Sequence, residues 1–323
     1  MGMTNNQLHL VGALAENRIQ DAKKYAIACC VEDTTRKNQM YVQRFKAMLE
    51  NRGHELIELP TNIKGLIQME DVSGFREERY YLGKKESEIY KNIEETNAVS
   101  LRLLELGLPY LNSTLLYGPP GTGKTMFGRY TAYRLGLPFA YVNFSYLIDS
   151  YMGNTSKNLH RVFDYCKGIK CVLMLDEIDC IGLKRSEGTG SSAGAELART
   201  TITLMQELDN LTNEQVVIAA TNRRDRLDPA LLRRFSTEEE FAPFDETERM
   251  ALACKFLEHI PGITFNRDEV RSYVQTPKTQ GEIIKFATRL VIRQITEEVN
   301  YSRSKSGACD SLTGSATLPD IRG

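Results

Sequence analysis

The sequence predicts an α/β fold, with a parallel five-stranded sheet flanked by helices and a small all-helical domain after it. Three observations predict this fold. Between Ser113 and Pro243, short apolar runs alternate with stretches of helical periodicity, which is the order of elements in a parallel sheet. The run from Cys171 to Leu175 is apolar at every position, as in a strand that is buried on both faces. Beyond Pro243 only helical periodicity remains.

These patterns divide the chain into four parts: a mostly helical N-terminal unit (1–69), a large α/β domain (70–243), a small helical domain (244–300) and a disordered tail (301–323). In the N-terminal unit, Tyr41, Phe45 and Met48 recur at helical spacing, and Gly53 ends that helix. The tail is rich in serine and glycine, a composition that buries too little apolar surface to fold.

The individual elements follow from the same periodicities. Strands are expected at 54–60, 114–117, 139–144, 171–175 and 216–220. Helices are expected at 124–135, 158–166, 196–208, 246–259, 267–274 and 281–299. A glycine-rich turn separates the strand at 114–117 from the helix that follows it.

Composition narrows the class of protein. Lysine plus arginine (41) nearly equals aspartate plus glutamate (42), so the chain has no global basic field to attract nucleic acid. The seven cysteines form no C-x-x-C pair, which indicates reduced thiols rather than a zinc site. No window reaches about 18 consecutive apolar residues, and the N-terminus lacks the features of a signal peptide. We therefore expect a cytoplasmic protein without a membrane segment.

The strongest motif is Gly118-Pro-Pro-Gly-Thr-Gly-Lys124-Thr125, a complete match to the P-loop pattern G-x-x-x-x-G-K-[ST]. Its glycines let backbone N–H groups turn toward phosphates, and the following helix directs its positive end at the same anion. Lys124 is expected to contact the β- and γ-phosphates of ATP, and Thr125 to bind Mg²⁺. The residues expected to hold the nucleotide here are Gly118, Pro119, Pro120, Gly121, Thr122, Gly123, Lys124, Thr125 and Met126.

A second motif places two acids at the end of the buried strand. In an open α/β sheet, ligands bind beyond the carboxyl ends of the strands, which is where Asp176 and Glu177 stand. Asp176 is expected to hold Mg²⁺ together with Thr125, and to count among the nucleotide-binding residues. Glu177 is expected to orient and activate the water that attacks ATP.

These motifs, with Ala219-Ala-Thr-Asn222-Arg and Leu227-Asp-Pro-Ala-Leu-Leu-Arg233-Arg234-Phe, resemble the AAA clade of the AAA+ ATPases. The resemblance implies that Asn222 contacts the γ-phosphate and the attacking water. It implies that Arg233 and Arg234 act on ATP in the neighbouring subunit, although here they are adjacent, so which one reaches the phosphate stays open. It also implies that Gly281 opens a helix of the lid domain beside the nucleotide.

The same resemblance suggests a substrate contact. Tyr151-Met152-Gly153 occupies the place of the family's pore loop, whose aromatic, hydrophobic and glycine residues grip an extended polypeptide. An aromatic ring beside a flexible thioether can pack against varied side chains. The alternative is that Tyr151 packs in the core at a turn between strand and helix.

Two functions of different classes remain open at this stage, beside a third option, a nucleotide-dependent assembly scaffold with slow turnover. The first is a ring-forming ATPase, expected to be a hexamer of identical chains, that remodels or threads a protein substrate, with residues 1–69 selecting the partner. The alternative is an ATP-switched nucleic-acid machine of the helicase-loader or transposition-regulator type. The balanced charge of the chain favours the first function over the second.

Overall fold

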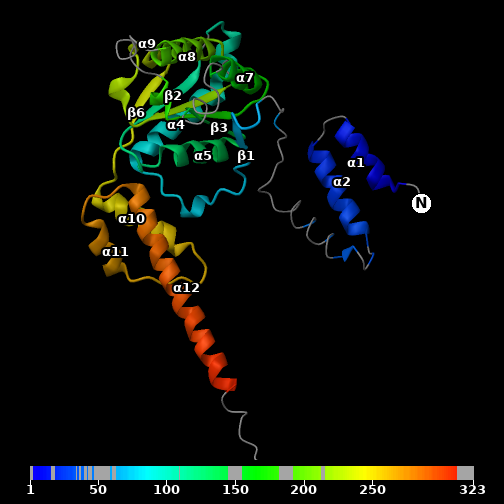
Figure 1. Cartoon of the computed structure of the whole chain (residues 1–323), viewed down its shortest axis with the longest axis vertical. Coiled ribbons are helices and arrows are strands. Elements are labelled where there is room, and N and C mark those ends of the chain that lie inside the picture. Colours follow the sequence, from blue (N-terminus) through cyan, green and yellow to red (C-terminus); the bar gives the residue numbers. More distant parts are fainter. Residues whose placement is uncertain are drawn as a thin grey trace, which may run out of the picture.

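The protein is described from a computed structural model of the chain (Figure 1). The structure describes residues 3–15, 19–33, 63–108, 110–144, 155–181, 192–211 and 215–310, with a few single positions between 35 and 59. The predicted pore loop, Tyr151 to Gly153, lies outside the described residues, as does almost all of the helix and strand expected between 41 and 60. Among the described helices, none combines the length and apolar composition that crossing a bilayer requires.

A six-stranded sheet forms the centre of the large domain, in the order β1-β3-β4-β5-β2-β6. Its strands are β1 (Gln68–Glu70), β2 (Asn112–Tyr117), β3 (Phe139–Asn143), β4 (Val172–Asp176), β5 (Val216–Thr221) and β6 (Thr237–Glu240). Every pairing is parallel except that of β1 with β3. The predicted α/β fold is confirmed, but the sheet has six strands rather than five, and one of them is antiparallel.

The two strands at the edges of the sheet have no apolar pattern in the sequence. β6 reads Thr-Glu-Glu-Glu and β1 has three residues, Gln-Met-Glu. An edge strand has a partner on one side only and keeps part of its surface in water, so its side chains need not be apolar. Hydrophobic periodicity therefore cannot detect these strands.

Helices cover both faces of the sheet (Figure 1). On one face, α7 (Thr155–Lys167) and α8 (Ser192–Asp209) pack over alternate strand residues such as Leu173 and Leu175. On the other face, α4 (Lys84–Glu105) and α5 (Lys124–Leu135) pack over Val172 and Met174. Because β4 is buried on both faces, its sequence is continuously apolar, as predicted.

The lid domain consists of α10 (Glu246–Glu258), α11 (Arg267–Val274) and α12 (Gln280–Asp310) around its own apolar core. Asp245 and Glu248 form a capping box that begins α10. α12 continues past the other two helices (Figure 1) and ends at Asp310, so residues 301–310, which the sequence analysis assigns to the tail, are helical. No proline interrupts this stretch, and extending an existing helix adds one hydrogen bond per residue. Residues 311–323 lie outside the described part.

The N-terminal residues are helical where they are described, as expected: α1 (Asn5–Ala15) and α2 (Ile19–Glu32) pair, with His9 stacked on Tyr25 at 5.0 Å between ring centroids. However, the domain boundary predicted at 69/70 falls inside β1. Ile63 and Ile67 are also buried in the core of the large domain. Hydrophobic periodicity does not reveal β1, because it has only three residues and reads Gln-Met-Glu.

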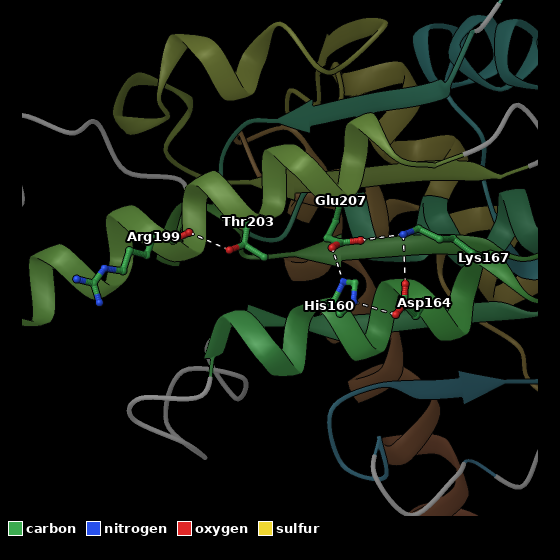
Figure 2. Close-up of polar contacts among 6 residues, drawn as sticks. All are labelled: His160, Asp164, Lys167, Arg199, Thr203 and Glu207. Carbon is green, nitrogen blue, oxygen red and sulfur yellow. Dashed lines mark hydrogen bonds and ion pairs between the residues drawn. The ribbon is translucent and has the colours of Figure 1, made fainter.

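A polar network joins α7 to α8 outside the apolar core (Figure 2). His160 Nδ1 lies 2.6 Å from Glu207 Oε1, and its Nε2 lies 3.1 Å from Asp164 Oδ2. Lys167 Nζ contacts the same two carboxylates, at 3.0 Å from Glu207 and 3.3 Å from Asp164. By residue type His160, Asp164 and Glu207 could hold a metal ion. The ammonium group of Lys167 lies within ion-pair distance of both carboxylates and offsets part of their charge, so we interpret the cluster as a salt-bridge network.

We expect Glu207→Ala to lower the free energy of unfolding by about 1–3 kcal/mol, because it removes the hydrogen bonds of a buried carboxylate to His160 and to the ammonium group of Lys167. Thr203→Ala on the same helix is the control. Thr203 bonds only the carbonyl of Arg199 at an exposed site, so its effect stays within about 0.5 kcal/mol. Urea denaturation measures both; equal effects would contradict the role of the network.

Candidate nucleotide site

Parallel pairing brings the three predicted motifs to one edge of the sheet. Tyr117 at the end of β2 stands in register with Thr221 at the end of β5, and Leu175 of β4 stands in register with Ala219. The P-loop follows β2, Asp176 ends β4, and Asn222 follows β5. Groups that are about 50 residues apart in sequence therefore converge beyond the carboxyl ends of neighbouring strands.

The glycines of the P-loop are required by the backbone. Gly118 has φ 145° and Gly123 has φ 91°, values that residues with a side chain rarely adopt. A Cβ atom on Gly118 would lie 2.2 Å from the carbonyl oxygen of Phe241, which is too close for any side chain. The loop leads directly into α5, whose first residue is Lys124. The N-terminus of that helix therefore faces the loop, as anion binding requires.

Lys124 is nearly buried, and its ammonium group is held by polar partners. Nζ donates to the carbonyls of Gly118 (2.8 Å) and Pro119 (2.9 Å) and to Oδ1 of Asn222 (2.8 Å). Burial lowers the pKa of Lys124, while the nearby Asp176 acts in the opposite direction by favouring the charged form. Lys124, which is predicted to bind the phosphates, therefore hydrogen-bonds directly to Asn222, which is predicted to contact the γ-phosphate and the attacking water.

Thr125 and Asp176 also meet. The Thr125 hydroxyl donates to Asp176 Oδ2 at 2.7 Å, so the two predicted Mg²⁺ ligands lie within direct contact. Tyr141 of β3 donates to the same carboxylate oxygen at 3.3 Å. A carboxylate and a hydroxyl at this spacing, beside a phosphate-binding loop, are the donor set that Mg²⁺ prefers. These residues therefore fit the ion that the P-loop motif implies.

Glu177 has an unusual backbone. Its φ of 56° and ψ of 41° make it the non-glycine residue with a left-handed conformation in the described part of the chain. Such a conformation costs roughly 1–2 kcal/mol for an ordinary residue, and strained residues of this kind concentrate at functional sites. Its N–H donates to Asp176 Oδ1 at 3.0 Å. The turn thus fixes Glu177 against the carboxylate of Asp176, in the place predicted for a residue that activates water.

These groups line one pocket of about 790 Å³, between the large domain and the lid. The predicted residues in its lining are Pro120, Gly121, Thr122, Gly123, Lys124, Thr125, Met126, Asp176, Glu177, Asn222 and Gly281. Gly118 and Pro119 contribute their carbonyls to Lys124 instead. Gly281 N–H donates to the carbonyl of Gly121 at 2.8 Å, so the lid contacts the P-loop where the sequence predicted it.

Sequence reasoning missed the apolar part of this pocket. It comes from the loop before α4 and from the lid, and includes Phe75, Tyr80, Tyr81, Phe244, Leu252 and Phe256. A signal for it lies in the segment Glu70-Asp-Val-Ser-Gly74, which directly precedes Phe75 and weakly resembles the short motif that lines the adenine pocket in the AAA clade. Aromatic faces of this kind suit the stacking of a base.

The two predicted finger arginines stand outside this pocket and differ from each other. Arg234 is tied down within its own chain: it donates to the carbonyl of Ala230 at 2.7 Å and pairs with Asp209 at 3.2 Å. Arg233 is exposed, and its guanidinium makes no ion pair or hydrogen bond with other residues in the part of the chain that the structure describes. The structure does not bring either arginine to the nucleotide pocket of the same chain.

The fold and this site define a P-loop ATPase domain followed by a helical lid. Residues 114–243 match the family model described as "ATPase family associated with various cellular activities (AAA)". The chain therefore carries an AAA ATPase domain, as the motifs suggested.

Individual relatives agree with this assignment. The chain is 36% identical over 209 residues to the 26S proteasome regulatory subunit 8 homolog of Schizosaccharomyces pombe, a match that covers 61% of this chain and 52% of the relative. It is 42% identical over 134 residues to the 26S proteasome regulatory subunit 10B of Dictyostelium discoideum, covering 40% and 34%. The chain thus spans about half the length, or less, of these curated relatives.

We expect Lys124→Ala to weaken ATP binding by at least about 100-fold, because the positive charge that pairs with the phosphates is lost. Isothermal titration of a nucleotide analogue measures this. The midpoint of urea unfolding serves as control and should move little, since water can solvate the carbonyls that Lys124 leaves. Unchanged affinity for the nucleotide would contradict the site.

Proposed function

We propose that this chain is an Mg²⁺-dependent ATPase that acts as one subunit of a hexameric ring of identical chains and remodels a protein substrate. The observation that carries the proposal is the convergence, in one pocket, of the Lys124–Asn222 and Thr125–Asp176 pairs. Both pairs join a residue of the P-loop to a residue at the end of another strand. This is the arrangement that phosphoryl transfer to water requires.

Each side chain has one role in the proposed reaction. Lys124 and the backbone N–H groups of the P-loop bind the phosphates, and Asn222 orients the γ-phosphate and the water. Glu177 takes a proton from that water as it attacks the γ-phosphorus, and the bond from the γ-phosphorus to the bridging oxygen breaks to release ADP. Mg²⁺, held by Thr125 and Asp176, would neutralise charge on the β- and γ-phosphate oxygens.

The proposed ring follows from Arg233. Arg233 is exposed and lies outside the nucleotide pocket of its own chain, so if it acts on ATP, as the family resemblance implies, that ATP is bound by another chain. A guanidinium keeps its charge and matches phosphate oxygens with its fixed fork. Arg234 is the weaker candidate, since leaving Asp209 would break its ion pair. One face of each subunit then meets the opposite face of the next, and such head-to-tail contacts form a ring when the rotation between neighbours closes.

The names of the relatives support a protein substrate over a nucleic acid, since they are regulatory subunits of the 26S proteasome. The balanced charge of the chain supports the same choice. Tyr151-Met152-Gly153 remains our prediction for the loop that contacts the polypeptide. These three residues lie in the segment 145–154, between β3 and α7 in the sequence. β3 also carries Tyr141, whose hydroxyl donates to Asp176.

Mixing two inactive variants tests the ATPase and the ring together. Glu177→Gln should bind ATP without hydrolysing it, and Arg233→Ala should also bind ATP with turnover reduced about 10³-fold or more. In a mixed ring, the Glu177→Gln subunit supplies its Arg233 to the intact pocket of its neighbour. Phosphate release per mole should therefore recover in the mixture, to a fraction of the wild-type rate.

Arg234→Ala is the matched control for this experiment. It removes an adjacent arginine of the same charge, and we expect a loss of stability with turnover retained, because Arg234 bonds Asp209 and Ala230. A mixture that stays inactive would exclude action of Arg233 between subunits. A wild-type chain that releases no phosphate from ATP would exclude the ATPase itself.

The substrate contact has its own test. Tyr151→Ala should leave the ATPase rate within about two-fold of wild type. The rate at which a tagged model protein is unfolded should fall at least ten-fold, because the aromatic side chain that contacts the polypeptide is absent. Fluorescence loss of the tagged protein measures unfolding. An equal loss of ATPase activity would instead indicate that Tyr151 packs in the core.

A further inference from the structure

One tyrosine outside the predicted motifs contacts the metal-binding carboxylate. Tyr141 lies on β3, next to β4, and its hydroxyl donates to Asp176 Oδ2 at 3.3 Å. The same oxygen accepts the Thr125 hydroxyl at 2.7 Å, while Oδ1 accepts the N–H of Glu177 at 3.0 Å. Asp176 is therefore held by three donors, one each from β3, the P-loop helix and its own turn.

The hydroxyl of Tyr141 is itself oriented. Asn143, two residues further along β3, donates from Nδ2 to the Tyr141 oxygen at 3.2 Å. With that lone pair engaged, the tyrosine O–H is directed at Asp176. Residues two apart on a strand share one face, so Asn143 and Tyr141 reach the same side of the sheet.

The ring of Tyr141 is fixed from the edge of the sheet. The guanidinium carbon of Arg129 lies 5.9 Å from the centre of the Tyr141 ring, within the range of a cation–π contact. Arg129 in turn forms a two-bond pair with Glu70 of β1, at 2.7 and 2.9 Å. Such bidentate pairs have a defined geometry. The tyrosine is thus held at both its ring and its hydroxyl.

We propose that Tyr141 is a positioning residue for Mg²⁺: it holds the carboxylate of Asp176 in the orientation that binds the ion. This inference rests on the proposed ATPase function and names a residue that the P-loop motifs do not contain. Partners that hydrogen-bond a metal ligand fix its orientation, and their loss typically weakens metal binding 10–100-fold. One contact at 3.3 Å among three donors belongs at the low end of that range.

The test removes the hydroxyl alone. Tyr141→Phe keeps the ring, the Arg129 contact and the strand. Mn²⁺ serves as the probe, and its binding to the full chain with a non-hydrolysable ATP analogue is followed by electron paramagnetic resonance. We expect the dissociation constant for Mn²⁺ to rise about 10-fold, and the affinity for the nucleotide in the presence of EDTA to stay within about two-fold of wild type.

Tyr90→Phe is the matched control, because it removes another tyrosine hydroxyl that bonds a carboxylate, Glu94 at 2.6 Å, away from the nucleotide pocket. It should leave Mn²⁺ binding unchanged. An unchanged Mn²⁺ affinity in Tyr141→Phe would overturn the proposal. So would an equal loss of nucleotide affinity with and without metal, which would indicate a general structural role. A wild-type chain that bound neither nucleotide nor Mn²⁺ would instead contradict the proposed ATPase function itself.

Discussion

The parallel pairing of β4, β5 and β2 is the constraint on which the site depends. Register places the ends of these strands side by side, so the P-loop, Asp176 and Asn222 need no further element to bring them together. The same pairing makes the burial of Lys124 tolerable, because its three partners are supplied by the loop after β2 and the residue after β5. A buried ammonium group without such partners would lose its proton or destabilise the fold.

Residues with a strong local requirement could be predicted from the sequence. The apolar run of β4, the glycines of the P-loop and the helix from Lys124 to Leu135 each follow from a rule about a few neighbouring residues. The structure places them as expected. The limits of the prediction appear at the edges of the sheet, where β6 is mostly glutamate. Pairing with β2 decides the conformation there, and no periodicity records it.

Contacts between distant elements could not be predicted. The difference between Arg233 and Arg234 depends on Asp209, the last residue of α8, which pairs with Arg234. No sequence motif connects Asp209 with these arginines. Tyr141 illustrates the same limit, because its role depends on the register of β3 with β4 rather than on any motif. The apolar lining of the pocket likewise draws on a loop and a lid that are far apart in the chain. The binding and catalytic motifs could be predicted because each depends on neighbouring residues. The residues that position those motifs could not be predicted, because they come from distant elements.

The contact between the lid and the P-loop consists of main-chain atoms, from the N–H of Gly281 to the carbonyl of Gly121. A Cβ atom at residue 281 would lie 3.3 Å from that carbonyl oxygen, so the close approach depends on the absence of a side chain there. Exposed residues further along α12, such as Ile292 and Ile295, take no part in this contact. The exposed surface of the lid can therefore change to suit neighbours in an assembly while the main-chain joint between Gly281 and Gly121 is kept.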